Sequence, residues 1–120
     1  MASASFLVVE DETLIRMMLV EMIEELGHRV FAEAGTLEDG IRAARDGAFD
    51  AALLDVNLGG RPIFPVADAL KERGVPFAFA SGYGPIGVPA EFRDRPVLQK
   101  PFQQADLEKA LLTAIAGKGR

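Results

Sequence analysis

The sequence contains no cysteine and only one histidine, His28. The lack of cysteine excludes a disulfide framework, a thiolate zinc site and a cysteine nucleophile, and it fits a reducing cytoplasm. No apolar run reaches the roughly 18 residues of a membrane-spanning helix, and the N-terminus lacks the basic region of a signal peptide. Positive charge is also in deficit: 13 Lys and Arg against 18 Asp and Glu give a net charge of −5, which disfavours a general nucleic-acid surface. We therefore expect a cytoplasmic protein with no membrane and no nucleic-acid partner.

Apolar side chains, by contrast, are plentiful enough for a core, since 49% of the 120 residues are hydrophobic. That length suits one domain. We expect a single domain over residues 1–120, without a separate output domain.

Short apolar runs alternate with amphipathic segments along the chain. Apolar runs bounded by turn residues are typical of strands buried on both faces, and apolar residues at three- and four-residue spacing are typical of helices. The expected strands are residues 6–9, 29–34, 50–54, 76–80 and 97–99, and the expected helices are residues 14–26, 37–48, 66–73 and 104–116. This alternation predicts an α/β fold with a parallel sheet covered by helices on both faces.

Two segments are too rich in proline or glycine for regular structure. Pro62 and Pro65 predict a loop over residues 59–65. Residues 82–95 hold three glycines and two prolines, which leaves room only for a short helix at residues 90–93.

Four of the expected strands end at polar residues, and parallel strands place these ends at one edge of the sheet, where ligands bind. These residues are Glu10 and Asp11 after the first strand, Asp55 and Asn57 after the third, Ser81 after the fourth and Lys100 after the fifth. Three acids in one pocket repel one another unless a cation lies between them, and oxygen ligands without His or Cys favour Mg²⁺ over zinc. Lys100 and Ser81 add a positive charge and a hydroxyl donor, which suits an incoming phosphoryl group. Asp55 is then the predicted nucleophile, which would form an aspartyl phosphate.

Four blocks of sequence, in their order and spacing, resemble the receiver domain of bacterial two-component response regulators. They are Leu7-Val8-Val9-Glu10-Asp11-Glu12, Leu53-Leu54-Asp55-Val56-Asn57-Leu58, Ala80-Ser81-Gly82-Tyr83 and Leu98-Gln99-Lys100-Pro101-Phe102. The resemblance spans essentially the whole chain and implies a flavodoxin-like (βα)5 three-layer sandwich with strand order 2-1-3-4-5. It also implies a phosphoacceptor module of a phosphorelay and not a true enzyme. A histidine kinase or a phosphotransfer protein would be the donor, and the domain would act on a downstream partner or as a phosphate sink.

The resemblance implies a role for each acidic residue. Asp55 is the implied phosphoacceptor. The implied ligands of Mg²⁺, with Mn²⁺ as the alternative ion, are Glu10, Asp11, Asp55 and the backbone carbonyl of Asn57. Glu10 stands where Asp is more usual in the family, but a longer carboxylate still holds a metal-bound water.

For the phosphoryl group, the resemblance implies contacts from Ser81, which replaces the usual Thr, and from Lys100, with a cis Lys100–Pro101 bond. Val97 stands where the family usually has a switching aromatic residue. The stretch around Ser81 instead resembles a subgroup of single-domain receivers with a Phe-Ala-Thr-Gly-Tyr sequence, often associated with histidine kinases of the HWE type. In that subgroup the aromatic residue follows the fourth strand, so Tyr83 is the candidate switch.

Three alternatives compete with this interpretation. A phosphohydrolase with an aspartyl-phosphate intermediate commonly has a second Asp two residues after the nucleophile, where this chain has Asn57, which cannot act as an acid or base. A binding domain that works without phosphorylation has no need for the intact set of acids, lysine and hydroxyl. A serine hydrolase at Ser81 needs a nearby base, and His28 is expected at the surface near the opposite edge of the sheet.

Overall fold

The computed structural model describes residues 3–82 and 87–116. Along the chain the elements are β1 (Ser5–Val9), α1 (Thr13–Glu25), β2 (Arg29–Ala34), α2 (Leu37–Asp46), β3 (Ala51–Asp55), β4 (Asn57–Leu58), β5 (Arg61–Pro62), α3 (Phe64–Glu72), β6 (Phe77–Ser81), the 3-10 helix η2 (Ala90–Phe92), β7 (Val97–Gln99) and α4 (Gln104–Ala116). In the described part of the chain, no helix has the length and the apolar character needed to cross a membrane.

Five strands form one parallel sheet in the order β2-β1-β3-β6-β7. When the strands of this sheet are numbered by themselves, the order is 2-1-3-4-5, as expected. The central strand β3 is buried along its whole length and pairs with β1 on one side and β6 on the other. Because all five strands are parallel, their carboxyl ends lie along one edge of the sheet.

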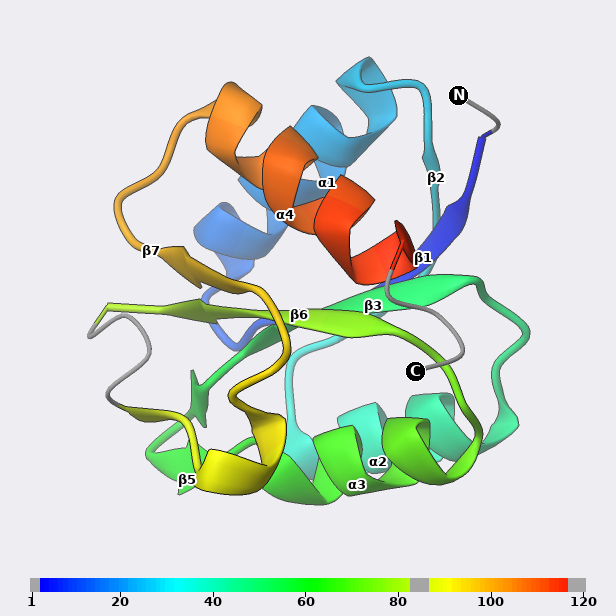
Figure 1. Cartoon of the computed structure of the whole chain (residues 1–120), viewed down its shortest axis with the longest axis vertical. Helices are drawn as coiled ribbons and strands as arrows, with labels where there is room; N and C mark the ends of the chain where they lie inside the picture. The colour runs from blue at the N-terminus through cyan, green and yellow to red at the C-terminus, as the bar shows by residue number, and fades with distance from the viewer. Residues whose placement is uncertain (1–2, 83–86, 117–120) are drawn as a thin grey trace.

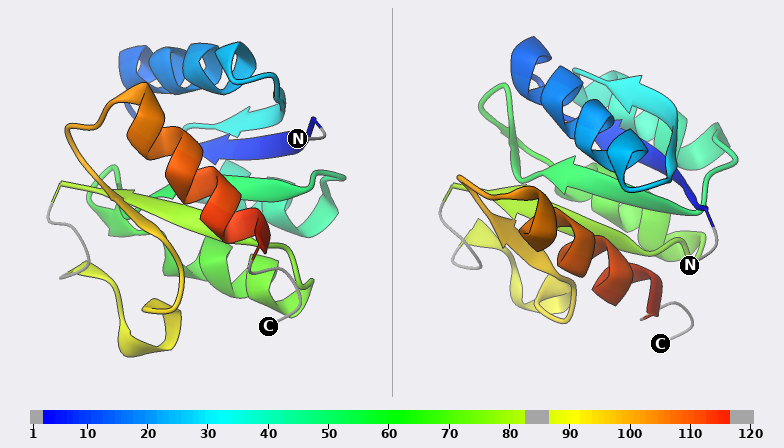
Figure 2. Two further views of the ribbon diagram at one scale, coloured as in Figure 1. Left: turned by 45° about the horizontal axis from the view of Figure 1, so that its top comes forward. Right: turned by 90° about the horizontal axis from the view of Figure 1, so that it is seen from above.

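The sheet is the middle of three layers. Helices α1 and α4 cover one face, and α2 and α3 cover the other (Figure 1); Figure 2 shows the same layers from two other directions. Successive strand residues point to opposite faces, so each face has its own core. Phe6 and Val8 of β1 pack with α1 and α4, while Leu7 and Val9 pack with α2 and α3.

Local signals explain where the helices begin and end. The Thr36 hydroxyl accepts a hydrogen bond from the Asp39 backbone N–H at 3.1 Å and caps the start of α2. Gly27 follows α1 with a φ of +92°, a left-handed conformation that favours glycine. The helices end within two residues of the expected positions.

The segment before α3 differs from the prediction. Residues 57–62 form a small antiparallel hairpin, β4–β5, which takes up the first half of the loop expected over residues 59–65. Helix α3 begins at Phe64, two residues early, with Pro65 in its first turn. Proline is tolerated there because a backbone N–H at that position has no partner within the helix. The expected barrier to helix formation at Pro65 was therefore wrong.

The short helix expected at residues 90–93 is present as the 3-10 helix η2. Its Phe92 is fully buried and packs against the rings of Phe64, Phe77 and Phe79, with centroids 5.9 Å away in each case. Phe92 therefore belongs to the core on this side of the sheet, although it stands on a single 3-10 turn and not on a regular α-helix.

His28 is buried, and the expectation of a surface position was wrong. Its Nδ1 accepts a hydrogen bond from the Ala4 backbone N–H at 3.0 Å, and its ring meets the Phe6 ring edge-on at 5.3 Å. A histidine with an aromatic neighbour and a backbone partner is stable in a core. It lies next to the first residue of β2, far along the sheet from Ser81, so it offers no base to that serine.

Candidate functional site

The carboxyl ends of the strands surround a cleft of about 310 Å³. Its lining includes Asp11, Asp55, Asn57, Ser81 and Lys100, which come from β1, β3, β6, β7 and the segments that follow them. Glu10, the sixth expected residue, is buried beside this cleft and is only 1% exposed. The structure thus brings to this edge the side chains that the sequence expects there.

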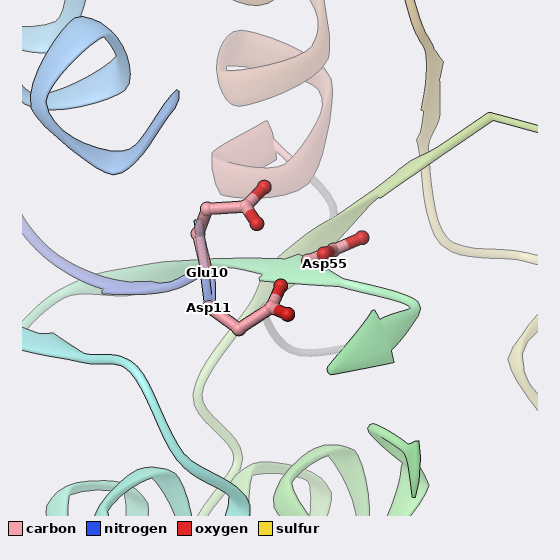
Figure 3. Close-up of side chains that lie close together, drawn as sticks. All are labelled: Glu10, Asp11 and Asp55. Carbon is pink, nitrogen blue, oxygen red and sulfur yellow. The ribbon is translucent and has the colours of Figure 1, made fainter. Parts of the chain in front are cut away.

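Three carboxylates meet at the site. Glu10, Asp11 and Asp55 each place one oxygen within 4.8 Å of the others (Figure 3). Three carboxylates this close repel one another when ionised, and a divalent cation among them relieves the repulsion. Oxygen ligands alone are what Mg²⁺ prefers, so the donor set fits this ion.

Lys100 connects two of the acids. Its Nζ donates to Glu10 Oε1 at 3.0 Å and to Asp55 Oδ1 at 3.4 Å. The Lys100–Pro101 peptide bond is cis, as the resemblance implied. The ammonium group therefore lies beside Asp55 at the edge of the cleft.

The site perturbs the ionisation of these groups. Burial raises the pKa of Glu10 to about 7 and outweighs the hydrogen bonds from the Glu12 backbone N–H and from Lys100, which lower it. Burial likewise raises the pKa of Asp55, against the opposing charge of Lys100. For Lys100, burial lowers the pKa, but the hydrogen bond to Glu10 and the charge of Asp55 prevail and the pKa is raised. Three carboxylates thus share one ammonium group, and when ionised they leave an excess of negative charge that a divalent cation would neutralise.

Asp11 is held from the other side of the cleft. Its Oδ2 accepts a hydrogen bond from the Gly59 backbone N–H at 3.0 Å. Gly59 and Gly60 form the turn of the β4–β5 hairpin with φ of +58° and +82°. Positive φ at both turn residues is the geometry of a two-residue hairpin that favours glycine. This hairpin was missed in the sequence, although Gly59-Gly60 between two strand-compatible residues is a known signal for it.

Ser81, Tyr83 and Val97 are the remaining residues of the sequence hypothesis. Ser81 is buried in β6, where its backbone carbonyl accepts the Lys100 backbone N–H at 2.9 Å, and its hydroxyl side lines the cleft next to Gly87. Tyr83, the candidate switch, lies outside the described residues. Val97 of β7 is half-buried and packs at the margin of the core.

Arg16 is a site neighbour that sequence reasoning missed. Its Nη1 donates to the backbone carbonyl of Glu10 at 2.6 Å. In the sequence, Arg16 is a charged residue within the amphipathic helix α1. A single charged residue in such a helix does not identify a role.

A larger hollow of about 450 Å³ lies between β7 and α4. Its charged side chains, Asp106 and Lys109, have opposite signs, and it contains none of the clustered acids. Size alone therefore does not make it the better candidate, and the cleft at the strand ends is the functional site we consider.

Comparison with known proteins agrees with this geometry. The family profile described as "Response regulator receiver domain" matches residues 6–112. Among characterised proteins, the chain is 30% identical over 114 residues to the transcriptional regulatory protein PdtaR of Mycobacterium tuberculosis, covering 92% of this chain and 56% of PdtaR. The chain thus spans little more than half the length of that relative.

Among solved structures, SdrG from Sphingomonas melonis Fr1 is 44% identical, with a TM-score of 0.84 over 96% of this chain and 99% of SdrG. The BeF3-activated conformation of SdrG gives a TM-score of 0.79 over the same shares of the two chains. The receiver domain of the PhyR response regulator from Erythrobacter litoralis is 28% identical, with a TM-score of 0.83 over 99% of this chain and 95% of that domain.

Proposed function

Because the chain belongs to the response regulator receiver domain family, a signalling module of two-component systems, we propose that Asp55 is its phosphoacceptor. The observation that carries this proposal is the meeting of three carboxylates with Lys100 in one cleft at the strand ends. The family explains the kind of chemistry, and the cleft is what supports assigning it to these residues.

Asp55 is the acid best suited to accept the group. Glu10 has both carboxylate oxygens engaged, one by Lys100 and one by the Glu12 backbone N–H. Asp55 lies in the cleft lining at the end of the central strand, between the strands that carry Asp11 and Ser81. A phosphoryl donor that enters the cleft therefore meets Asp55 with the Lys100 ammonium group beside it.

The acids fit Mg²⁺, with Mn²⁺ as the alternative ion. Asp11, Asp55 and the backbone carbonyl of Asn57 would hold it directly, and Glu10 would hold it through water. When bound, the ion would neutralise negative charge on the carboxylates and on the incoming phosphoryl oxygens.

The proposed transfer uses the side chains in fixed roles. An Asp55 oxygen attacks phosphorus, a new O–P bond forms, and the P–N bond to the donor histidine breaks with the electron pair returning to the imidazole. Lys100 pairs with a phosphoryl oxygen and the Ser81 hydroxyl donates a hydrogen bond to another. The products are an acyl phosphate on Asp55 and a free donor histidine.

The donor is proposed to be a histidine kinase or a phosphotransfer protein, and a kinase of the HWE type is our candidate. SdrG has an activated conformation with BeF3, a phosphoryl mimic, and its similarity supports the same response in this chain. Such a kinase uses ATP, so we also propose that the domain acts in the cytoplasm. The phosphorylated domain would then act on a downstream protein or drain phosphate from the kinase.

The test is intact-mass measurement after incubation with Mg²⁺ and acetyl phosphate, a small acyl phosphate donor. The wild type is expected to gain one phosphoryl group, and Asp55→Asn is expected to gain none. Asp68→Asn, an exposed substitution on α3 away from the cleft, is the matched control and should behave as the wild type. A stoichiometric, base-labile phosphate on the Asp55→Asn variant would contradict the assignment.

A further inference from the structure

Arg16 connects three elements near the acidic cluster. It lies in the first half of α1, and its Nη1 donates to the backbone carbonyl of Glu10 at 2.6 Å. Its Nε donates to Glu33 Oε1 on β2 at 3.3 Å. The side chain is only 20% exposed. The guanidinium thus bridges the end of β1 and the neighbouring edge strand.

Gly35 makes room for this guanidinium. A Cβ atom built on Gly35 would lie 2.8 Å from Arg16 Nη1, closer than such contacts normally occur, so the guanidinium would have to shift to make room for it. Gly35 is not among the glycines with positive φ, so its backbone does not require glycine. The absence of a side chain at position 35 is therefore explained by space for Arg16 and not by backbone conformation.

The carbonyl that Arg16 holds belongs to the peptide unit between the two acids. A peptide unit is planar, so fixing the Glu10 carbonyl oxygen also fixes the orientation of the Asp11 nitrogen and the approach of its Cα. The bond is charge-assisted, because its donor is a cationic guanidinium. At the other end, the Asp11 side chain is held by the Gly59 backbone N–H.

We propose that Arg16, seated over Gly35, is a positioning residue that sets the orientation of the Glu10–Asp11 peptide unit and thereby the affinity of the site for a divalent cation. This inference rests on the proposed function, since it concerns the same acidic cluster. Lys100 has a different role, because it contacts the Glu10 and Asp55 side chains inside the site, whereas Arg16 contacts the Glu10 backbone carbonyl and the Glu33 side chain.

The test is titration of the protein with Mg²⁺, with backbone amide NMR shifts of Asp11 and Gly59 as the readout. Outer-sphere partners of metal ligands typically change metal affinity by about 10–100-fold when they are removed. We expect Arg16→Ala to raise the dissociation constant for Mg²⁺ by about 10-fold. Gly35→Ala should have a similar effect, because its methyl group displaces the guanidinium.

Two further variants distinguish a role of Arg16 in positioning the Glu10–Asp11 peptide unit from a role that only connects β1 to β2. In the double variant Arg16→Ala, Gly35→Ala the methyl group meets no guanidinium, so the affinity should equal that of Arg16→Ala. Arg16→Lys keeps the charge and one donor and should restore part of the affinity. Arg42→Ala, which removes an exposed ion pair with Asp39 on α2, is the control and should bind Mg²⁺ as the wild type does.

The phosphorylation rate supplies an independent readout. Because Arg16 does not touch the phosphoryl group, the rate with acetyl phosphate should recover in Arg16→Ala at saturating Mg²⁺ and be reduced only at limiting Mg²⁺. Thermal unfolding of each variant identifies any that fail to fold, and Gly35→Ala, which retains Arg16, then serves as the decisive variant.

The outcomes distinguish the two proposals. A wild type that binds no Mg²⁺ and accepts no phosphoryl group would end the proposed function. A wild type that binds Mg²⁺ together with folded Arg16→Ala and Gly35→Ala variants of unchanged affinity would overturn the positioning role alone. Additive losses in the double variant would also overturn it, since the two substitutions would then act through different routes.

Discussion

Without a divalent cation, the protein is expected to lose stability as the pH rises from about 5 to about 7.5. The perturbation is the ionisation of Glu10, whose pKa is raised to about 7 by burial among other acids. Below its unfolded-state pKa the carboxyl is protonated in both states. Between the two values the folded protein holds a proton that the unfolded chain has released, so stability falls as the pH rises.

The magnitude follows from the displacement of that pKa. The change from 4.5 to about 7 amounts to about 2.5 pH units. At about 1.36 kcal/mol per unit, the corresponding loss of unfolding free energy is about 3 kcal/mol, which is an upper limit because the ion pair with Lys100 adjusts as Glu10 ionises. The pKa of Asp55 is also raised, so its ionisation acts in the same direction.

The assay is urea unfolding of the metal-free protein across this pH range, repeated with excess Mg²⁺. Glu10→Gln cannot ionise and should remove most of the pH dependence, while Glu21→Gln on the exposed side of α1 should leave it unchanged. Mg²⁺ should reverse the trend, because it binds the ionised acids and stabilises the folded state by mass action. A metal-free wild type that becomes more stable toward neutral pH, or a Glu10→Gln variant with the wild-type slope, would refute the reasoning.

Three other predictions concern single elements of the structure. Lys100→Met should slow phosphorylation by acetyl phosphate by about 100-fold, since one preorganised charge at the reacting group is lost. Mass spectrometry of samples quenched at successive times measures the rate, and an unchanged rate would argue against a role of Lys100 in the transfer. Gly60→Ala should lower the unfolding free energy by about 1 kcal/mol because φ is +82° there, whereas Gly82→Ala should cost less in the same unfolding assay, because Gly82 is not among the glycines with positive φ. Phe92→Ala should cost about 3–5 kcal/mol in urea unfolding, because the ring is fully buried among three others, and a loss below about 1 kcal/mol would show that η2 is not part of the core.

The sequence was sufficient where one local signal had no competitor. Strands β2 and β7 and helix α4 have the bounds that apolar periodicity and the flanking Gly and Pro residues predict. The edge of the sheet that carries Glu10, Asp11, Asp55, Ser81 and Lys100 was also predictable, because parallel strands place their carboxyl ends together whatever the loops do.

Sequence reasoning failed where the outcome depended on contacts between distant segments. His28 has no sequence feature that reveals its burial, since its partners are the Ala4 backbone and the Phe6 ring. The role of Arg16 depends on a carbonyl six residues earlier and on an open position at Gly35. Pro65 was given too much weight as a helix breaker, although the first turn is the one place in a helix where proline fits.

The central claim is that Asp55 is the residue that receives phosphorus. Its most direct test is reduction of the acetyl phosphate-treated wild type with borohydride, which converts an aspartyl phosphate to homoserine, followed by peptide mass spectrometry. The account predicts homoserine at position 55, dependent on Mg²⁺ and absent without the phosphoryl donor. Homoserine at another acidic residue, or none despite a stoichiometric gain of phosphate, would contradict it.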